Sequence, residues 1–153
     1  MGSLVHRLTG FWDPADAEEF APAKDLRVIS RLEERYGVVL PQDFRAYLAE
    51  VAPAADYWDR EDVIWWEPRR IQNVDDEYEH RIKNEMVAEK SSKYLFFGDF
   101  MIWSWAWAIC CEEGKDHGKV VCIGGLTTDR IVADSFSEFL AKYVDDPFSV
   151  GPP

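Results

Sequence analysis

The most constraining feature of the sequence is a change in the spacing of its apolar residues along the chain. Helical spacing, with apolar residues at i, i+3, i+4 and i+7, occurs at 44–51 and again at 136–143. Between these segments lie four β-branched and aromatic runs, at 94–97, 102–111, 119–123 and 130–133. Short polar connections between such runs predict an antiparallel meander. Helices at both ends of a sheet indicate an α+β fold.

Further signals predict individual elements. Leu26, Ile29 and Leu32 are spaced as on a helix that ends at Gly37, and Pro41 opens the next helix, so the two form a helical hairpin. A short strand is expected at 63–66. A third, more polar helix is predicted from the apolar stripe Ile71, Val74, Tyr78, Ile82 and Met86, which follows Pro68. The closing helix begins with the capping box Ser135-Phe136-Ser137-Glu138.

These elements define the expected domain organisation. Residues 1–23 are predicted to be an irregular lead-in with room for a short helical turn, residues 24–146 a single α+β domain, and residues 147–153 a tail. The turns are expected at Gly98-Asp99, at 112–118 and at 124–129.

Charge and composition exclude several classes of protein. The 153 residues include 29 Asp and Glu against 17 Lys and Arg, a net charge of −12, yet 47% are apolar and 14% aromatic. A chain this apolar is not disordered. The acidic balance argues against direct nucleic-acid binding, which depends on clustered Lys and Arg, and favours a basic partner. The longest apolar run, 100–111, is too short for a membrane helix, so a soluble protein without membrane contact is expected.

The three cysteines also bear on localisation and on metal chemistry. Their odd number and spacing favour free thiols in a reducing compartment, so we expect a cytoplasmic protein. A zinc site could be assembled from Cys110, Cys111, His117 and Cys122. Adjacent residues of a strand point to opposite faces, however, and buried structural cysteines explain the same pattern. We therefore predict no metal site and no cofactor.

The predicted third helix carries one other candidate for chemistry. Helical spacing would place four polar residues on one face, namely Asp76, Glu79, His80 and Lys83. A carboxylate and an imidazole could perform acid–base catalysis. The solvated side of an amphipathic helix accounts for the same residues, and no catalytic residue is predicted.

Three groups of residues are candidates for binding a partner. The loop Asp56, Tyr57, Trp58, Asp59, Glu61 and Asp62 combines acids with large aromatic residues, and Asp75 with Asp76 forms a second acidic site. Carboxylates steer a basic partner, and aromatic residues anchor it. The alternating residues Trp103, Trp105 and Trp107 would share one face of a strand. Those indoles form either a buried layer or an exposed binding or self-association surface.

The order of elements and three motifs resemble one protein family. Tyr36-Gly37 followed by Leu40-Pro41-Gln42-Asp43-Phe44, the strand Tyr94 to Asp99, and the closing 134–140 segment, DSFSEFL, resemble the SUKH superfamily over residues 24–144. The superfamily is named for the yeast cell-wall assembly regulator type of domain, and its bacterial members are largely immunity proteins of polymorphic toxin systems. The resemblance implies no catalytic residues and a domain that neutralises a toxin by binding it.

Three functions are therefore considered. The leading hypothesis is a non-enzymatic immunity protein that binds a cognate toxin domain, such as a basic nuclease. The alternative is a regulatory or scaffold domain whose partner is an endogenous protein. The third is a small hydrolase or metal-dependent enzyme that uses Cys110, His117 and Cys122, or Asp76 and His80. The sequence does not specify the oligomeric state.

Overall fold

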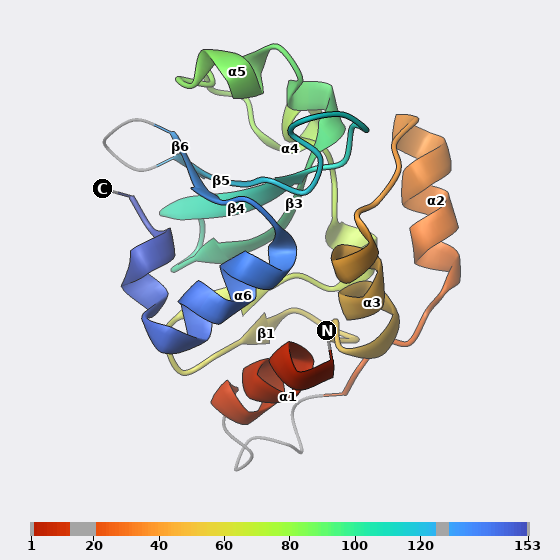
Figure 1. Cartoon of the computed structure of the whole chain (residues 1–153), viewed down its shortest axis with the longest axis vertical. Helices are drawn as coiled ribbons and strands as arrows, with labels where there is room; N and C mark the ends of the chain where they lie inside the picture. Colours follow the sequence, from red (N-terminus) through yellow and green to blue (C-terminus); the bar gives the residue numbers. More distant parts are fainter. Residues whose placement is uncertain (1, 13–20, 125–128, 153) are drawn as a thin grey trace.

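The structure is a computed structural model of the chain that describes residues 2–12, 21–124 and 129–152 (Figure 1). Part of the predicted irregular lead-in, at 13–20, and part of the predicted turn at 124–129 lie outside the described residues. Within the described part, the molecule is one six-stranded sheet with helices on both of its faces. The predicted α+β class is confirmed.

The sheet is an antiparallel meander, as predicted. Its strands follow the chain order: β1 (Tyr57–Trp58), β2 (Val63–Trp65), β3 (Tyr94–Phe100), β4 (Trp105–Cys110), β5 (Val120–Gly124) and β6 (Arg130–Ala133). The register between β3 and β4 shifts after Phe96, and Gly98 then pairs with Trp107. Glycine is favoured there, because a Cβ at residue 98 would make a tight contact of 3.1 Å with the carbonyl oxygen of Ile64.

The α-helices are α1 (Gly2–Phe11), α2 (Arg27–Tyr36), α3 (Gln42–Glu50), α4 (Val74–Glu77), α5 (Glu85–Ala88) and α6 (Phe136–Asp145). The 3₁₀ turns are η2 (Pro68–Arg70), η3 (Ser91–Lys93) and η4 (Pro147–Val150). Gly37 ends α2 with φ +63°, and the Ser135 hydroxyl accepts from the Glu138 amide at the start of α6. Both are the caps that the sequence predicts.

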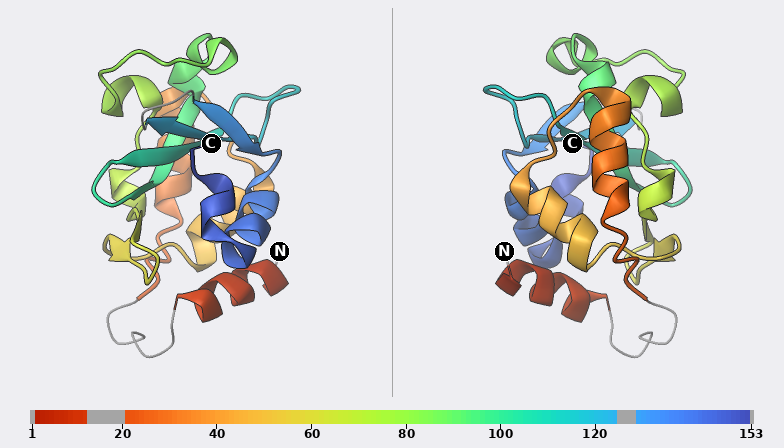
Figure 2. Two further views of the ribbon diagram at one scale, coloured as in Figure 1. Left: turned by 90° about the vertical axis from the view of Figure 1, so that its left-hand side faces the viewer. Right: turned by 90° about the vertical axis from the view of Figure 1, so that its right-hand side faces the viewer.

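Two apolar cores lie on opposite faces of the sheet. Helices α1, α2, α3 and α6 cover the larger core, which includes Trp65, Phe97, Trp107 and Phe139. The segment that contains η2, α4 and α5 covers the smaller core, around Trp66 and Phe96. The side views show α6 on one side of the sheet and the yellow-green segment with α4 on the other (Figure 2). The alternation of large and small residues along β4 serves both cores, since Ala106 and Ala108 face the smaller one.

Three local predictions are wrong. The single third helix is instead η2, α4 and α5, because the side chains of Asn73 and Asn84 each cap a separate one-turn helix. Residues 2–11 form a helix where an irregular segment was predicted. Gly98 and Asp99 belong to β3, and the chain turns at 101–104 instead.

The expected boundary after residue 146 does not separate a detached tail. In η4, Val150 is buried, and its carbonyl oxygen accepts a hydrogen bond from the Trp107 indole at 2.7 Å. Arg130 of β6 also donates to the carbonyl oxygens of Ser149 and Gly151. The described residues after α6 therefore pack against the sheet.

Candidate partner-binding surface

The loop of residues 56–62, which includes the short strand β1 and leads to β2, presents part of the predicted acidic and aromatic surface. Trp58 is 49% exposed, and its indole nitrogen donates to the Asp62 carboxylate at 3.1 Å. Asp56 is exposed, but Arg70 lies 2.6 Å from it and partly neutralises its charge. Glu61 is half-buried and Asp62 is exposed. A carboxylate beside an exposed indole is suited to contact with a basic protein.

Two residues of the same loop are buried and are withdrawn from the predicted surface. The Tyr57 hydroxyl donates to the Trp12 carbonyl oxygen at 2.6 Å. Asp59, 4% exposed, accepts hydrogen bonds from two backbone amides and two side chains: Glu61 N, Val63 N, Trp65 Nε1 and Tyr143 OH. These bonds hold the loop against β2 and α6, because a buried carboxylate is stable only where donors surround it. Asp59 is structural.

The predicted tryptophan ladder is only partly formed. Trp105 and Trp107 lie on the face that packs toward the larger core, where Trp107 is buried and Trp105 stacks on Phe100 at 4.3 Å between ring centroids. Trp103 packs against the smaller core on the other face. The alternation fails at residue 103 because that residue lies in the turn before β4, where φ is +65°.

The turn between β3 and β4 has an unusual backbone. Met101, Ile102 and Trp103 have φ angles of +44°, +53° and +65°, a left-handed run without glycine. The buried Asp99 carboxylate accepts from the Trp103 amide at 2.9 Å, and the Met101 amide donates to the Asp62 carbonyl oxygen at 3.0 Å. The turn is therefore tied both to β3 and to the loop that carries Trp58.

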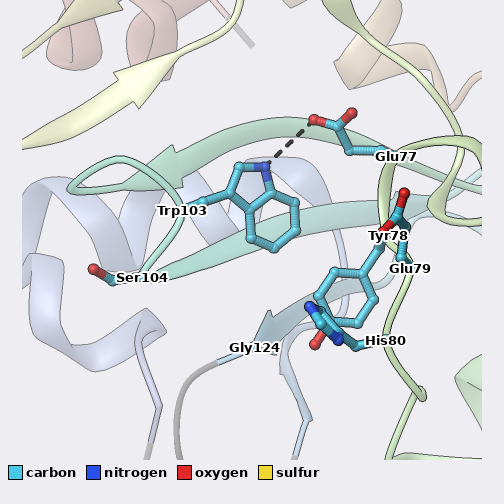
Figure 3. Close-up of a pocket in the computed structure, with 7 residues that line it drawn as sticks. All are labelled: Glu77, Tyr78, Glu79, His80, Trp103, Ser104 and Gly124. Atoms are coloured by element: carbon cyan, nitrogen blue, oxygen red, sulfur yellow. Dashed lines mark hydrogen bonds between the residues drawn. The ribbon is translucent and has the colours of Figure 1, made fainter.

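A cavity of about 490 Å³ lies beside this turn (Figure 3). It is lined by Glu77, Tyr78, Glu79, His80, Trp103, Ser104 and Gly124. Trp103 projects from the turn, donates to Glu77 at 3.4 Å and stacks on Tyr78 with ring centroids 5.3 Å apart. Burial, and secondarily the Asp129 carboxylate, raises the pKa of Tyr78, so this phenol is neutral at pH 7. The walls thus combine an aromatic pair with two carboxylates.

The second predicted acidic site lies elsewhere. Asp75 and Asp76 are exposed, but Asp75 accepts from Ser91, and Asp76 accepts from Arg35 and from the Tyr36 hydroxyl. Asp76 therefore connects α4 to α2. His80 instead lies in the cavity, because α4 ends at Glu77. The helical face that would have joined Asp76 to His80 does not exist.

The cysteine cluster is also divided. Cys110 faces the smaller core, whereas Cys111 and Cys122 face the larger one. Burial raises the pKa of all three thiols, that of Cys122 to about 12. The His117 ring nitrogen donates to the Val39 carbonyl oxygen at 2.6 Å. Within residues 2–12, 21–124 and 129–152, no group of three His, Cys, Asp or Glu could hold a metal ion.

Sequence reasoning missed several residues of this surface. Met101 and Ile102 were expected before or within a strand, and Glu77 and Glu79 on a plain helical face. Ser104, which interrupts the apolar run, was the available signal that the chain turns there. Glu79 was considered only together with Asp76 and His80 as a candidate for chemistry, and no comparable signal marked Glu77.

The fold and surface define an acidic α+β meander domain with exposed aromatic and aliphatic residues at one sheet end. A family model matches residues 25–142, and the chain belongs to the SMI1 / KNR4 family (SUKH-1). The resemblance to the SUKH superfamily is confirmed. No curated protein and no solved structure matches the chain. No helix among the described residues has both the length and the apolar character needed to cross a membrane.

Proposed function

We propose that the chain is an immunity protein that binds a basic toxin domain directly and blocks its active surface. Membership of the SUKH-1 family supports a role in protein interaction and is compatible with an immunity protein. The observation that carries the proposal is the surface around the β3–β4 turn. Exposed Trp58 and Ile102 lie there with the carboxylates of Glu61 and Asp62, and Glu79 lines the cavity beside the turn.

The surface has the two properties that a toxin-binding domain needs. Its carboxylates attract a basic partner from a distance, and the net charge of −12 extends this attraction over the whole molecule. Its aromatic and aliphatic side chains supply contact area once the partner has docked. Neither property requires a bound metal or cofactor.

Growth rescue tests the proposal. Each open reading frame adjacent to this gene is expressed from an inducible promoter, with and without the chain, and one that kills the cells is taken as the toxin. We expect cells to survive only when the chain is present, and the two proteins to purify as one complex. Equal killing with and without the chain would reject the immunity function and would favour an endogenous partner.

Matched charge reversals test the role of the surface. The variant in which Glu61, Asp62 and Glu79 are replaced by Lys should lose rescue. The control replaces Glu34, Glu89 and Glu113, three exposed acids elsewhere, and changes the net charge by the same amount. Rescue by the control but not by the first variant would show that position, and not total charge, matters.

A further inference from the structure

The exposed apolar side chains are concentrated near one end of the sheet. Among residues 7–12, 21–124 and 129–152, seven large apolar side chains are exposed, and four of them belong to this region: Trp58, Met101, Ile102 and Phe148. Ile102 is 74% exposed and Phe148 is 70% exposed, the two highest values of the seven. Exposed apolar residues that occur singly are ordinary, but a group of them indicates an interaction surface.

Contacts of Asp62 and Glu61 connect Trp58, Met101 and Phe148, and Ile102 follows Met101 in the turn. Asp62 accepts from the Trp58 indole through its carboxylate and from the Met101 amide through its carbonyl oxygen. Glu61 lines a small depression together with Phe100 and Phe148. We name Trp58, Glu61, Asp62, Met101 and Ile102 the hairpin-tip patch.

The turn at Met101, Ile102 and Trp103 has a strained, left-handed backbone. A β-branched residue such as Ile102 is strained at φ +53°, and its exposed side chain gains little from burial in return. Hydrogen bonds fix the turn, from the Trp103 amide to Asp99 and from the Ser104 amide to the Phe100 carbonyl oxygen. A rigid, exposed apolar tip loses little conformational entropy when it binds.

We propose that the hairpin-tip patch is the anchor of the interface with the toxin domain, an inference that rests on the proposed immunity function. Met101 and Ile102 enter an apolar depression on the partner. Lysine and arginine side chains at the rim of that depression face Glu61 and Asp62. The partner is thus a basic protein with an apolar pocket, and not a polyanion or a membrane.

Charge argues against a second copy of this chain as the occupant. A symmetric contact through the patch would bring Glu61 and Asp62 of one copy toward the same residues of the other. Like charges brought together in an interface oppose association, and each copy carries a net charge of −12. The same carboxylates favour a basic protein.

The test measures, by titration calorimetry, binding of an inactive variant of the toxin that the rescue experiment identifies. Met101→Asp and Ile102→Asp should each weaken binding by at least about tenfold, since anchors contribute more than their neighbours. Met86→Asp is the matched control, because Met86 and Met101 are both 49% exposed. Leu26→Asp is a second control, and both controls should bind within about twofold of the wild type.

The outcomes separate this inference from the function on which it rests. If Met101→Asp and Ile102→Asp bind the toxin and rescue growth as well as the wild type does, the patch is not the anchor of the interface. The immunity function would still stand. A wild type that neither binds nor rescues would overturn both. Sedimentation that shows a wild-type dimer dissociated by Ile102→Asp would assign the patch to self-association and would also overturn it. Circular dichroism and urea unfolding confirm that each variant is folded.

Discussion

At the scale of single residues, Asp59 shows how an acid in an acidic loop can serve the fold. Its two carboxylate oxygens accept from the amides of Glu61 and Val63 and from the side chains of Trp65 and Tyr143. Burial, and secondarily the Asp59 carboxylate, raises the pKa of Tyr143, so the phenol keeps its proton and remains a donor. Asp59 thereby joins the β1–β2 loop to α6.

Removing that carboxylate should be costly. We expect Asp59→Ala to lower the free energy of unfolding by about 3 kcal/mol, because it leaves several buried donors without an acceptor. Urea denaturation followed by tryptophan fluorescence measures the change. Glu34→Ala is the control, since Glu34 is exposed on α2, and it should change stability by less than about 1 kcal/mol. A loss as small for Asp59→Ala as for Glu34→Ala would contradict the structural role.

At the scale of elements, the β3–β4 turn combines strain with exposure. Replacing Ile102 by Gly should raise the free energy of unfolding by about 1 kcal/mol, because glycine adopts φ +53° without the Cβ conflict. Met86→Gly, in the helical α5, should instead lower it by about 1 kcal/mol. Urea denaturation of both variants measures whether each change raises or lowers the free energy of unfolding. A loss of stability in Ile102→Gly would show that the left-handed turn is not strained.

The sequence correctly predicted those elements that depend on residues close together in the chain. The capping box at Ser135 and the alternation from Trp105 to Cys111 were confirmed because each depends on residues close in sequence. The third helix was wrong because its apolar stripe continues across two asparagine caps. The burial of Asp59 and the side on which Trp103 packs depend on distant elements, and local spacing does not contain that information.

At the scale of the whole molecule, buried thiols and phenols make stability depend on alkaline pH. Burial raises the pKa of Cys110, Cys111 and Cys122, and also of Tyr47 and Tyr94. These groups ionise in the unfolded chain at a pH where the folded protein keeps them protonated. The contribution of these groups to the free energy of unfolding is fully present below their ordinary pKa values and is lost as pH rises. For Cys122, the loss occurs between pH 9.0 and about 12, the ordinary and the folded-state pKa of the thiol.

We therefore expect the urea midpoint, measured with a reductant present, to fall steadily from pH 8 to pH 10.5. Each thiol ionised only in the unfolded state contributes about 1.4 kcal/mol per pH unit. Cys122→Ala should be less stable at pH 7, and its loss of stability with pH should be shallower because one titrating thiol is gone. A slope identical to that of the wild type would show that Cys122 does not titrate with unfolding.

The net charge of −12 gives the last prediction, which concerns the rate of association with a basic toxin domain. Long-range attraction raises the association rate constant and is screened by salt, whereas dissociation depends mainly on short contacts. Between about 20 and 500 mM NaCl, we expect the association rate constant to fall at least about tenfold, with a much smaller change in dissociation. Stopped-flow tryptophan fluorescence measures both rates. Replacing Glu61, Asp62 and Glu79 by Lys should flatten the salt dependence more than replacing Glu34, Glu89 and Glu113. Equal flattening by both triple variants would mean that the total charge, and not the face around the hairpin tip, directs the encounter.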